Sequence, residues 1–234
     1  MSSLGCLYGV GVGPGDPELI TLKAWRILQN VSVVAYQAAE NRESVARAIA
    51  SSHLPGNQIE VCFRFPRALD PVAAKTDYDQ AISPVVEYLD QGLDVAVLCE
   101  GDPLFYGSFM YLYTRLSDRY HTEVIPGVSS PMACASALGV PLSYRNDIFS
   151  VLSATLAADA LEAQILNANA AAIIKLSRHF AKLRTILEKL DLTQRAQYIE
   201  CATMSNQKIM AISEVDDANV PYFSMVLIPS LMRF

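Results

Sequence analysis

The residues best suited to chemistry lie in the stretch 94–107. Residues 95–98 form a short apolar run, typical of a buried strand, and Gly101-Asp102-Pro103 ends that run at once. The following residues are Leu104, Phe105, Tyr106 and Gly107. In open α/β sheets, ligands bind beyond the carboxyl ends of strands. A plain turn would also use Gly101-Asp102-Pro103. The apolar strand before it and the aromatic residues after it favour a loop that holds a small molecule.

Two further loops have a composition that suits ligand binding. Gly11-Val12-Gly13-Pro14-Gly15-Asp16 holds more glycines than a turn needs, so we expect its backbone to line a cleft. No register of this loop matches Gly-x-Gly-x-x-Gly, and no Gly-Lys-Ser/Thr follows, which excludes the dinucleotide and P-loop motifs. Pro126-Gly127-Val128-Ser129-Ser130 reads as a turn and a helix cap, or as a source of N–H groups and hydroxyls for a ligand.

The elements that must position these loops alternate in type. Strands are predicted at 7–12, 31–36, 59–63, 95–98 and 123–125, with helices at 17–28, 44–52, 75–90 and 108–117. This βα alternation predicts a parallel sheet covered by helices. A small-residue helix at 128–139 is followed by strands at 148–152, 171–174, 196–201, 208–211 and 223–228, and by helices at 159–167 and 179–190. We expect 196–201 and 208–211 to form a hairpin in a mixed sheet. The chain therefore divides into two α/β domains, 1–126 and 127–234.

Composition limits the function classes. The 234 residues are 52% hydrophobic and 18% charged, which predicts a folded chain with a large core. A net charge of −6 and the lack of a basic run argue against a nucleic-acid partner. The sequence shows no membrane span and no signal peptide. The five cysteines are far apart, so we expect reduced, buried thiols in a cytoplasmic protein. Cysteine and histidine spacing indicates no protein-bound metal.

Taken together, the three loops resemble the tetrapyrrole (corrin/porphyrin) methylases, which use S-adenosylmethionine. The resemblance is specific and spans the whole chain. The strings Gly101-Asp102-Pro103-Leu104-Phe105-Tyr106-Gly107-Ser108-Phe109-Met110-Tyr111-Leu112 and Glu200-Cys201-Ala202-Thr203-Met204 look most like the branch that methylates C(20) of precorrin-2 in cobalamin synthesis. The resemblance implies two α/β domains with the cofactor in the cleft between them, in agreement with the boundary near residue 126.

The resemblance also assigns site residues. S-adenosylmethionine would be held by Gly101, Asp102, Pro103, Leu104, Phe105, Tyr106, Ser129, Ser130, Leu176 and Thr203. Asp102 would accept a hydrogen bond from the ammonium group of the cofactor or from a nearby backbone donor. Relatives often carry Met or Val with Gly around the Leu176 position, so its backbone contact is the better supported one. The tetrapyrrole, precorrin-2 or its cobalt complex, would face Gly13, Pro14, Gly15 and Asp16.

The implied reaction asks mainly for positioning. A sulfonium methyl group is already activated, and holding it in line with an electron-rich ring carbon contributes up to roughly 7–11 kcal/mol. Asp16 and Tyr222 are the candidate bases for removing the proton of that carbon. The carboxylates of the substrate require arginines, available at 42, 64, 67, 145 and 178, although most of these should be solvated surface charges. Residues 64–79 are a candidate substrate-side flap, and the family plan implies a homodimer.

Three alternatives remain at the level of sequence. A sibling corrin methylase would act at another ring carbon. A protein or RNA methylase would share the fold, although the acidic charge disfavours RNA. A tetrapyrrole-binding module without catalytic activity would lack cofactor binding, so titration with S-adenosylmethionine separates it from the enzymes.

Overall fold

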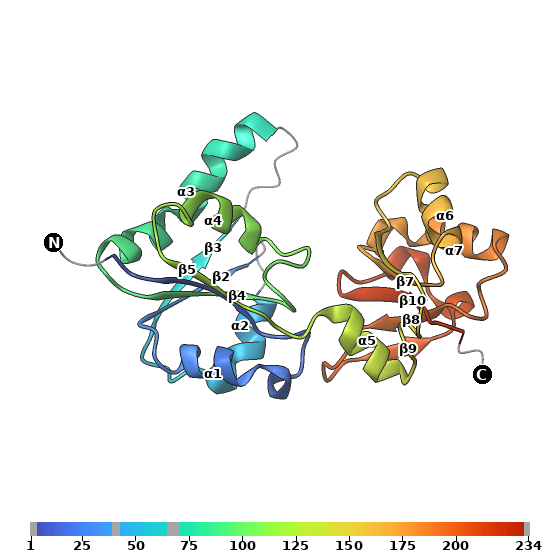
Figure 1. The fold of residues 1–234 in the computed structure, drawn as a ribbon, viewed down its shortest axis with the longest axis horizontal. Coiled ribbons are helices and arrows are strands. Elements are labelled where there is room, and N and C mark those ends of the chain that lie inside the picture. The colour runs from blue at the N-terminus through green and yellow to red at the C-terminus, as the bar shows by residue number, and fades with distance from the viewer. Residues whose placement is uncertain (1–3, 39–42, 65–70, 232–234) are drawn as a thin grey trace. The chain divides into compact units, whose positions relative to one another are not determined.

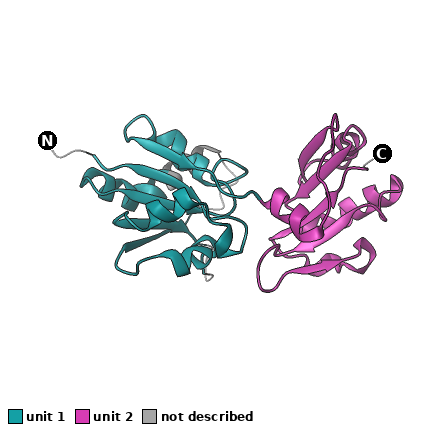
Figure 2. Ribbon diagram, turned by 60° about the horizontal axis from the view of Figure 1, so that its bottom comes forward, with its two compact units in different colours: residues 1–129 teal, residues 130–234 magenta. Residues whose placement is uncertain are grey.

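A computed structural model describes residues 4–38, 43–64 and 71–231. The chain forms two compact units, Met1–Ser129 and Ser130–Phe234, which are coloured separately in Figure 2. Each unit contains one five-stranded sheet. Within the described residues, no helix is long and apolar enough to cross a membrane.

The sheet of the first unit is parallel throughout, as predicted. Its strands lie in the order β3-β2-β4-β1-β5. Their bounds are β1 Leu7–Gly11, β2 Val33–Gln37, β3 Ile59–Phe63, β4 Val95–Cys99 and β5 Thr122–Ile125. Every residue of β4 is buried, which explains its wholly apolar sequence. Because all five strands run the same way, their carboxyl ends meet at one edge of the sheet.

Helices cover both faces of this sheet (Figure 1). The helices are α1 Leu22–Leu28, α2 Val45–Ala50, α3 Pro71–Asp90 and α4 Phe109–Leu116, with short 3-10 helices η1 Pro17–Leu19 and η2 Ser51–His53. One apolar cluster joins the sheet to α1 and α2, and a second joins it to α3 and α4. The alternation of side chains along each strand supplies both clusters, so the sheet is buried on both faces.

The first helix differs from the prediction, because the expected helix at 17–28 is two helices. Asp16 caps η1 by accepting a hydrogen bond from the Glu18 N–H at 2.9 Å, and Thr21 caps α1 by accepting one from the Ala24 N–H at 3.2 Å. A threonine cap stabilises a new helix start and so breaks the continuous pattern. Leu22, expected on the apolar face, is 86% exposed for that reason.

The sheet of the second unit is mixed, as predicted, in the order β6-β7-β10-β8-β9. Its strands are β6 Phe149–Ser153, β7 Ala170–Ile174, β8 Gln197–Glu200, β9 Lys208–Met210 and β10 Ser224–Ile228. β6 and β7 are parallel, and β10 lies antiparallel between β7 and β8. β8 and β9 pair antiparallel, so the predicted hairpin is confirmed.

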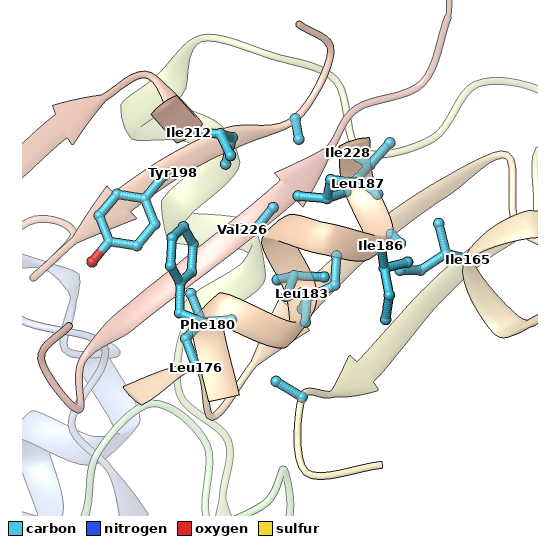
Figure 3. Close-up of a cluster of buried hydrophobic side chains, with 14 of the residues drawn as sticks. Ile165, Leu176, Phe180, Leu183, Ile186, Leu187, Tyr198, Ile212, Val226 and Ile228 are labelled. Carbon is cyan, nitrogen blue, oxygen red and sulfur yellow. The ribbon is translucent and has the colours of Figure 1, made fainter. Parts of the chain in front are cut away.

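Two helical layers bury this second sheet. The helices are α5 Ser130–Leu138, α6 Ala158–Leu166 and α7 Phe180–Lys189, with 3-10 helices η3 Ser177–His179, η4 Ile212–Glu214 and η5 Asp217–Asn219. The larger apolar cluster lies beneath α6 and α7, where the Phe180 and Tyr198 rings meet edge to face with centroids 5.4 Å apart (Figure 3). The other face packs against the small residues of α5.

All five cysteines are free thiols, but the prediction that they are buried is wrong for some of them. Cys99 and Cys134 are buried, whereas Cys62 is exposed. Cys62 lies on β3, an edge strand of its sheet, where a strand has a neighbour on one side only.

Candidate functional site

Three loops of the first unit meet at the carboxyl edge of its sheet. The loop after β1 and the loop after β4 form an isolated antiparallel bridge. The Gly13 N–H donates to the Gly101 carbonyl at 3.3 Å, and the Gly101 N–H donates to the Gly13 carbonyl at 2.8 Å. The third loop, after β5, joins them because the Gly127 N–H donates to Asp102 Oδ2 at 3.2 Å. The three glycine-containing motifs are therefore brought together in one assembly.

Two glycines make this contact possible by their lack of a side chain. A Cβ on Gly11 would lie 2.5 Å from the Gly127 nitrogen, and a Cβ on Gly127 would lie 2.1 Å from the Gly101 carbonyl oxygen. Both distances are far inside van der Waals contact. The backbones of the three loops thus pack directly against each other, and any side chain at these positions would separate them.

The carboxylate of Asp102 binds backbone groups of its own unit. Oδ1 accepts a hydrogen bond from the Leu104 N–H at 2.9 Å, while Oδ2 accepts the one from Gly127. The sequence predicted that this side chain would accept a hydrogen bond from the ammonium group of the cofactor or from a nearby backbone donor. The contacts seen here are of the second kind. Asp102 therefore fixes the shape of its loop and ties the loop after β4 to the loop after β5.

The segment from Leu104 to Gly107 projects side chains outward. Leu104 is 50% exposed and Tyr106 is 47% exposed. Tyr106 has a positive φ of 55°, and its ring meets the Phe105 ring edge to face with centroids 5.1 Å apart. Pro103 is buried below them. Exposed apolar side chains on a strained turn suit a binding loop, because strain of this kind concentrates at ligand sites.

The glycine-rich loop is largely buried, so only part of it can contact a substrate. Gly13 and Pro14 are buried, and Gly15 and Asp16 are half-buried. Asp16 Oδ1 caps η1, so part of the carboxylate proposed as a base holds local structure. The structure therefore leaves Gly15 and Asp16 as the accessible part of this loop.

Ser129 and Ser130 lie at the junction of the two units. Both are half-buried, and Ser130 is the first residue of α5. The predicted start of this helix at 128 is thus two residues too early. Gly127, bound to Asp102, comes two residues before Ser129, so the chain enters this pair from the loop assembly of the first unit.

In the second unit, the remaining predicted residues share one sheet edge. Leu176 follows β7, Thr203 follows β8, and Tyr222 precedes the antiparallel β10. Leu176 as a whole residue is fully buried in the apolar cluster next to Phe180, so it supports this edge from the core. Tyr222, by contrast, is 70% exposed.

At this edge, several residues other than glycine have a strained backbone. Lys175, Ser177, Cys201 and Thr203 have positive φ values of 58°, 26°, 47° and 67°. The Thr203 N–H is held by Gln207 Oε1 at 2.7 Å, which stabilises the loop in this form. Non-glycine residues in this region cost about 1–2 kcal/mol each. Residues in such conformations cluster at active sites and ligand clamps, so this edge is a candidate site.

Two carboxylates at strand ends were not singled out from the sequence. Glu100, which follows β4, accepts a hydrogen bond from the Ala46 N–H at 3.3 Å. Although the residue as a whole is exposed, desolvation of its carboxylate raises the pKa of Glu100. Glu200, at the end of β8, accepts one from the buried Tyr198 hydroxyl at 2.6 Å. For Glu100, an acidic residue directly after an apolar strand was the available signal.

The candidate arginines do not form one group. Arg64 and Arg178 are exposed, and Arg178 follows Leu176 at the strained edge of the second unit. Arg145 lies before β6, at the opposite edge of that sheet. Arg42 and Arg67 lie outside the described residues, as does the part of the predicted flap at 65–70. Among the described residues, no group of His, Cys, Asp and Glu side chains could hold a metal ion.

Comparison with known proteins defines the class. A family model described as Tetrapyrrole (Corrin/Porphyrin) Methylases matches residues 6–217, and the chain belongs to this family. The precorrin-2 C(20)-methyltransferase of a Sinorhizobium species is 40% identical over 234 residues, covering 97% of this chain and 96% of that protein. The cobalamin biosynthesis protein CobIJ of Mycobacterium tuberculosis (strain H37Rv) is 38% identical over 241 residues. That alignment covers all of this chain but only 47% of CobIJ, so the chain spans about half the length of this relative.

A solved structure shows the same fold. Uroporphyrin-III C-methyl transferase from Thermus thermophilus, complexed with S-adenyl homocysteine, superposes with a TM-score of 0.67 at 22% identity. The superposition covers 96% of this chain and 92% of that protein.

Proposed function

We propose that this protein is an S-adenosylmethionine-dependent C-methyltransferase that methylates C(20) of precorrin-2, or of its cobalt complex, in cobalamin biosynthesis. The observation that carries the proposal is the 40% identity, along nearly the full length of both chains, with a precorrin-2 C(20)-methyltransferase. The CobIJ relative supports the same biosynthesis. A sibling activity at another ring carbon is the alternative that the experiment below must exclude.

We assign cofactor binding to the loop after β4 and to the strained edge of the second unit. Exposed Leu104 and Tyr106 offer apolar surface suited to a nucleoside, and the fixed backbone of the loop offers polar groups beside them. Ser129 and Ser130 add hydroxyls. Leu176 is fully buried, so it would support this edge from the core, and Thr203 adds a held backbone of unusual conformation. The S-adenyl homocysteine complex of the Thermus protein, which has the same fold, supports this ligand.

The chemistry then needs little covalent help from the protein. S-adenosylmethionine, when bound, supplies a methyl group on a positively charged sulfur. The protein must hold the ring carbon in line with that group and exclude competing orientations. The hydrogen bonds that join the three loops serve this purpose, since a preformed loop loses little entropy when ligands bind.

A base must accept the proton that the ring carbon loses after methylation. We propose Asp16 and Tyr222 as the two candidates. Asp16 Oδ1 accepts the hydrogen bond from the Glu18 N–H, so this carboxylate also caps η1. Tyr222 is largely exposed, and its ring is supported by Phe223, with centroids 5.1 Å apart. Gly13, Pro14 and Gly15 would then shape the tetrapyrrole side, with the exposed Arg64 and Arg178 available to substrate carboxylates.

Labelled methyl transfer tests the proposal directly. The protein is incubated with methyl-¹³C cofactor and precorrin-2, with and without cobalt, and the label is located by carbon NMR. Label at the bridge carbon C(20) is the expected result. Comparing transfer to the two substrates shows whether the preferred substrate carries cobalt. Label on another carbon would establish a sibling activity. Cofactor binding without any transfer would contradict an enzyme that uses this substrate, and no cofactor binding would favour a carrier.

We also propose that the protein is a cytoplasmic homodimer. The family plan supports the dimer, and five free thiols suit a reducing compartment. Light scattering coupled to size-exclusion chromatography measures the mass. A monomer mass at micromolar concentration would contradict the dimer.

A further inference from the structure

The second unit holds a pocket of about 470 Å³ that the proposed methyl transfer does not use. It is lined by the turn at Tyr144, Arg145, Asn146 and Asp147, and by Asn169 and Arg195. The lining residues precede β6, β7 and β8, or follow the antiparallel β10. The pocket therefore lies at the sheet edge opposite to Leu176, Thr203 and Tyr222.

Arg195 is fixed at this pocket with donor groups to spare. Its Nε donates to the Pro229 carbonyl at 2.9 Å, and its Nη2 donates to the carbonyls of Pro229 and Asn169. Its Nη1 makes no hydrogen bond to the described part of the chain. Burial lowers the pKa of the Arg195 guanidinium, and the nearby charge of Asp147 opposes that change only in part. A negatively charged ligand at Nη1 would further offset the cost of burying this cation.

Arg145 supplies a second guanidinium. It is exposed, has a positive φ of 47°, and lies over the Tyr144 ring at 5.0 Å from the ring centroid. The turn that imposes this backbone is closed by Asp147, whose N–H donates to the Tyr144 carbonyl at 3.0 Å. An arginine in a conformation that favours glycine persists only where the surrounding structure holds it, and such positions concentrate at ligand sites.

The single carboxylate in the lining does not cancel these two charges. Asp147 Oδ2 accepts hydrogen bonds from the Tyr144 N–H and from the Ser230 hydroxyl. The pocket thus combines two arginines, one engaged carboxylate and the amides of Asn146 and Asn169. This local excess of positive charge occurs in a chain whose net charge is −6.

We propose that this pocket binds a small polyanion, a molecule with two or more carboxylate or phosphate groups. Guanidinium groups recognise both kinds of group through paired N–H donors. The volume lies within the range of roughly 300–1,000 Å³ that holds small organic molecules. The ligand is distinct from the methyl donor, because the pocket and the strained edge lie at opposite ends of the strands of one sheet.

Calorimetry on the full chain, without cofactor or tetrapyrrole, tests the proposal independently of the methyltransferase activity. The probes are citrate for carboxylates, pyrophosphate for phosphates, and glycerol as an uncharged control. We expect one or both anions to bind and glycerol to give no signal. Arg145→Gln should weaken anion binding about tenfold, as the loss of a charge-assisted pair predicts. Lys189→Gln removes the same charge from α7, outside the pocket lining, and should change binding less than about twofold.

Two further measurements keep the test decisive. Arg145→Gly removes the charge while retaining a backbone that glycine adopts readily, so it should match Arg145→Gln even if the glutamine variant is less stable. In amide NMR spectra, bound anion should shift the side-chain signals of Asn146 and Asn169. The proposal is overturned if neither anion binds, if Arg145→Gln and Lys189→Gln weaken binding equally, or if the shifts occur at Thr203 instead.

Discussion

The two units build their candidate ligand-binding edges in different ways. In the first unit, three loops are joined by backbone contacts through Gly11, Gly101 and Gly127, and the Asp102 carboxylate links two of them. In the second unit, the edge after β7 and β8 relies on non-glycine residues held at positive φ, among them Lys175 and Thr203. The first edge is close-packed, with Tyr106 as its one described non-glycine residue at positive φ, whereas the second has four such residues after β7 and β8.

This difference separates two physical tasks. A close-packed edge holds its shape before a ligand arrives and fails when a single atom is added. A strained edge lowers the free energy of unfolding, and the fold becomes more stable when the strain is released. Substitutions in the two edges should therefore have effects of different size and of opposite sign.

The largest effect is expected for Gly127→Ala. The added Cβ would lie 2.1 Å from the Gly101 carbonyl oxygen, so the loops must separate. We expect the free energy of unfolding to fall by about 3 kcal/mol or more, measured by urea denaturation. Gly56→Ala is the matched control, because Gly56 has a φ of 84° but nothing within 4 Å of a Cβ, and it should cost about 1–2 kcal/mol. Equal losses in both variants would show that the loops do not pack as described.

Asp102→Ala should have the next largest effect. It leaves the Leu104 and Gly127 N–H groups without their acceptor, which should cost about 2 kcal/mol. Because the loop loses its shape, the dissociation constant for S-adenosylhomocysteine, measured by calorimetry, should rise about tenfold. Asp216→Ala is the control, since Asp216 also accepts a backbone hydrogen bond two residues on, from the Ala218 N–H at 3.0 Å. Unchanged cofactor binding in Asp102→Ala would mean that the loop has been assigned wrongly.

Thr203→Gly tests the strained edge and should act in the other direction. Glycine removes a strain of about 1–2 kcal/mol, less the roughly 0.5–1 kcal/mol that it adds to unfolded-state freedom. We expect stability to rise by up to about 1 kcal/mol while methyl transfer slows. Thr193→Gly, at a loop threonine with ordinary backbone, should instead lower stability by about 1 kcal/mol. A similar loss of stability in both variants would remove strain as the distinction between the two edges.

The smallest expected effect is a pH dependence at Glu100. Its folded-state pKa is raised above the ordinary value of 4.5, so its stabilising contribution is complete below that pH and is lost as the pH rises through the folded-state pKa. At pH 7 the ionised carboxylate therefore opposes folding, and Glu100→Gln should raise the Tm. The increase should vanish near pH 4.

Glu60 provides a control of opposite sign in the same unit. Arg47 and Tyr36 lower the pKa of the Glu60 carboxyl by hydrogen bonding to it. Its contribution is present at neutral pH and is lost as the pH falls, so Glu60→Gln should lower the Tm at pH 7. Shifts of the same sign for both variants would contradict these assignments.

The sequence predicted the strands and the family well, because both depend on local patterns. The apolar run of β4 and the hairpin of β8 and β9 follow from residues adjacent in the chain. Local signals were less reliable where two of them competed, as at Thr21, whose cap interrupts the helix expected from Pro17 onward.

The contacts of the candidate site could not be predicted in the same way. The bond between Asp102 and Gly127 joins loops 25 residues apart, and the pocket near Arg145 includes Arg195. The positive φ of Thr203 has no signal in a sequence that lacks glycine there. The burial of Leu176 depends on α7, which packs over it from later in the chain. The first two features join segments that are distant in the chain, and the last two depend on how neighbouring loops and helices pack.

The order of the strands along the chain also determines when each unit can form during synthesis. The first sheet is complete once Ile125 has been made, so the first unit can fold while the rest is still being translated. The second sheet has its latest strand at the centre, between β7 and β8. Until Ile228 leaves the ribosome, the hairpin of β8 and β9 has no strand to join it to β6 and β7. The strained edge of the second unit therefore takes shape only after β10 has been made.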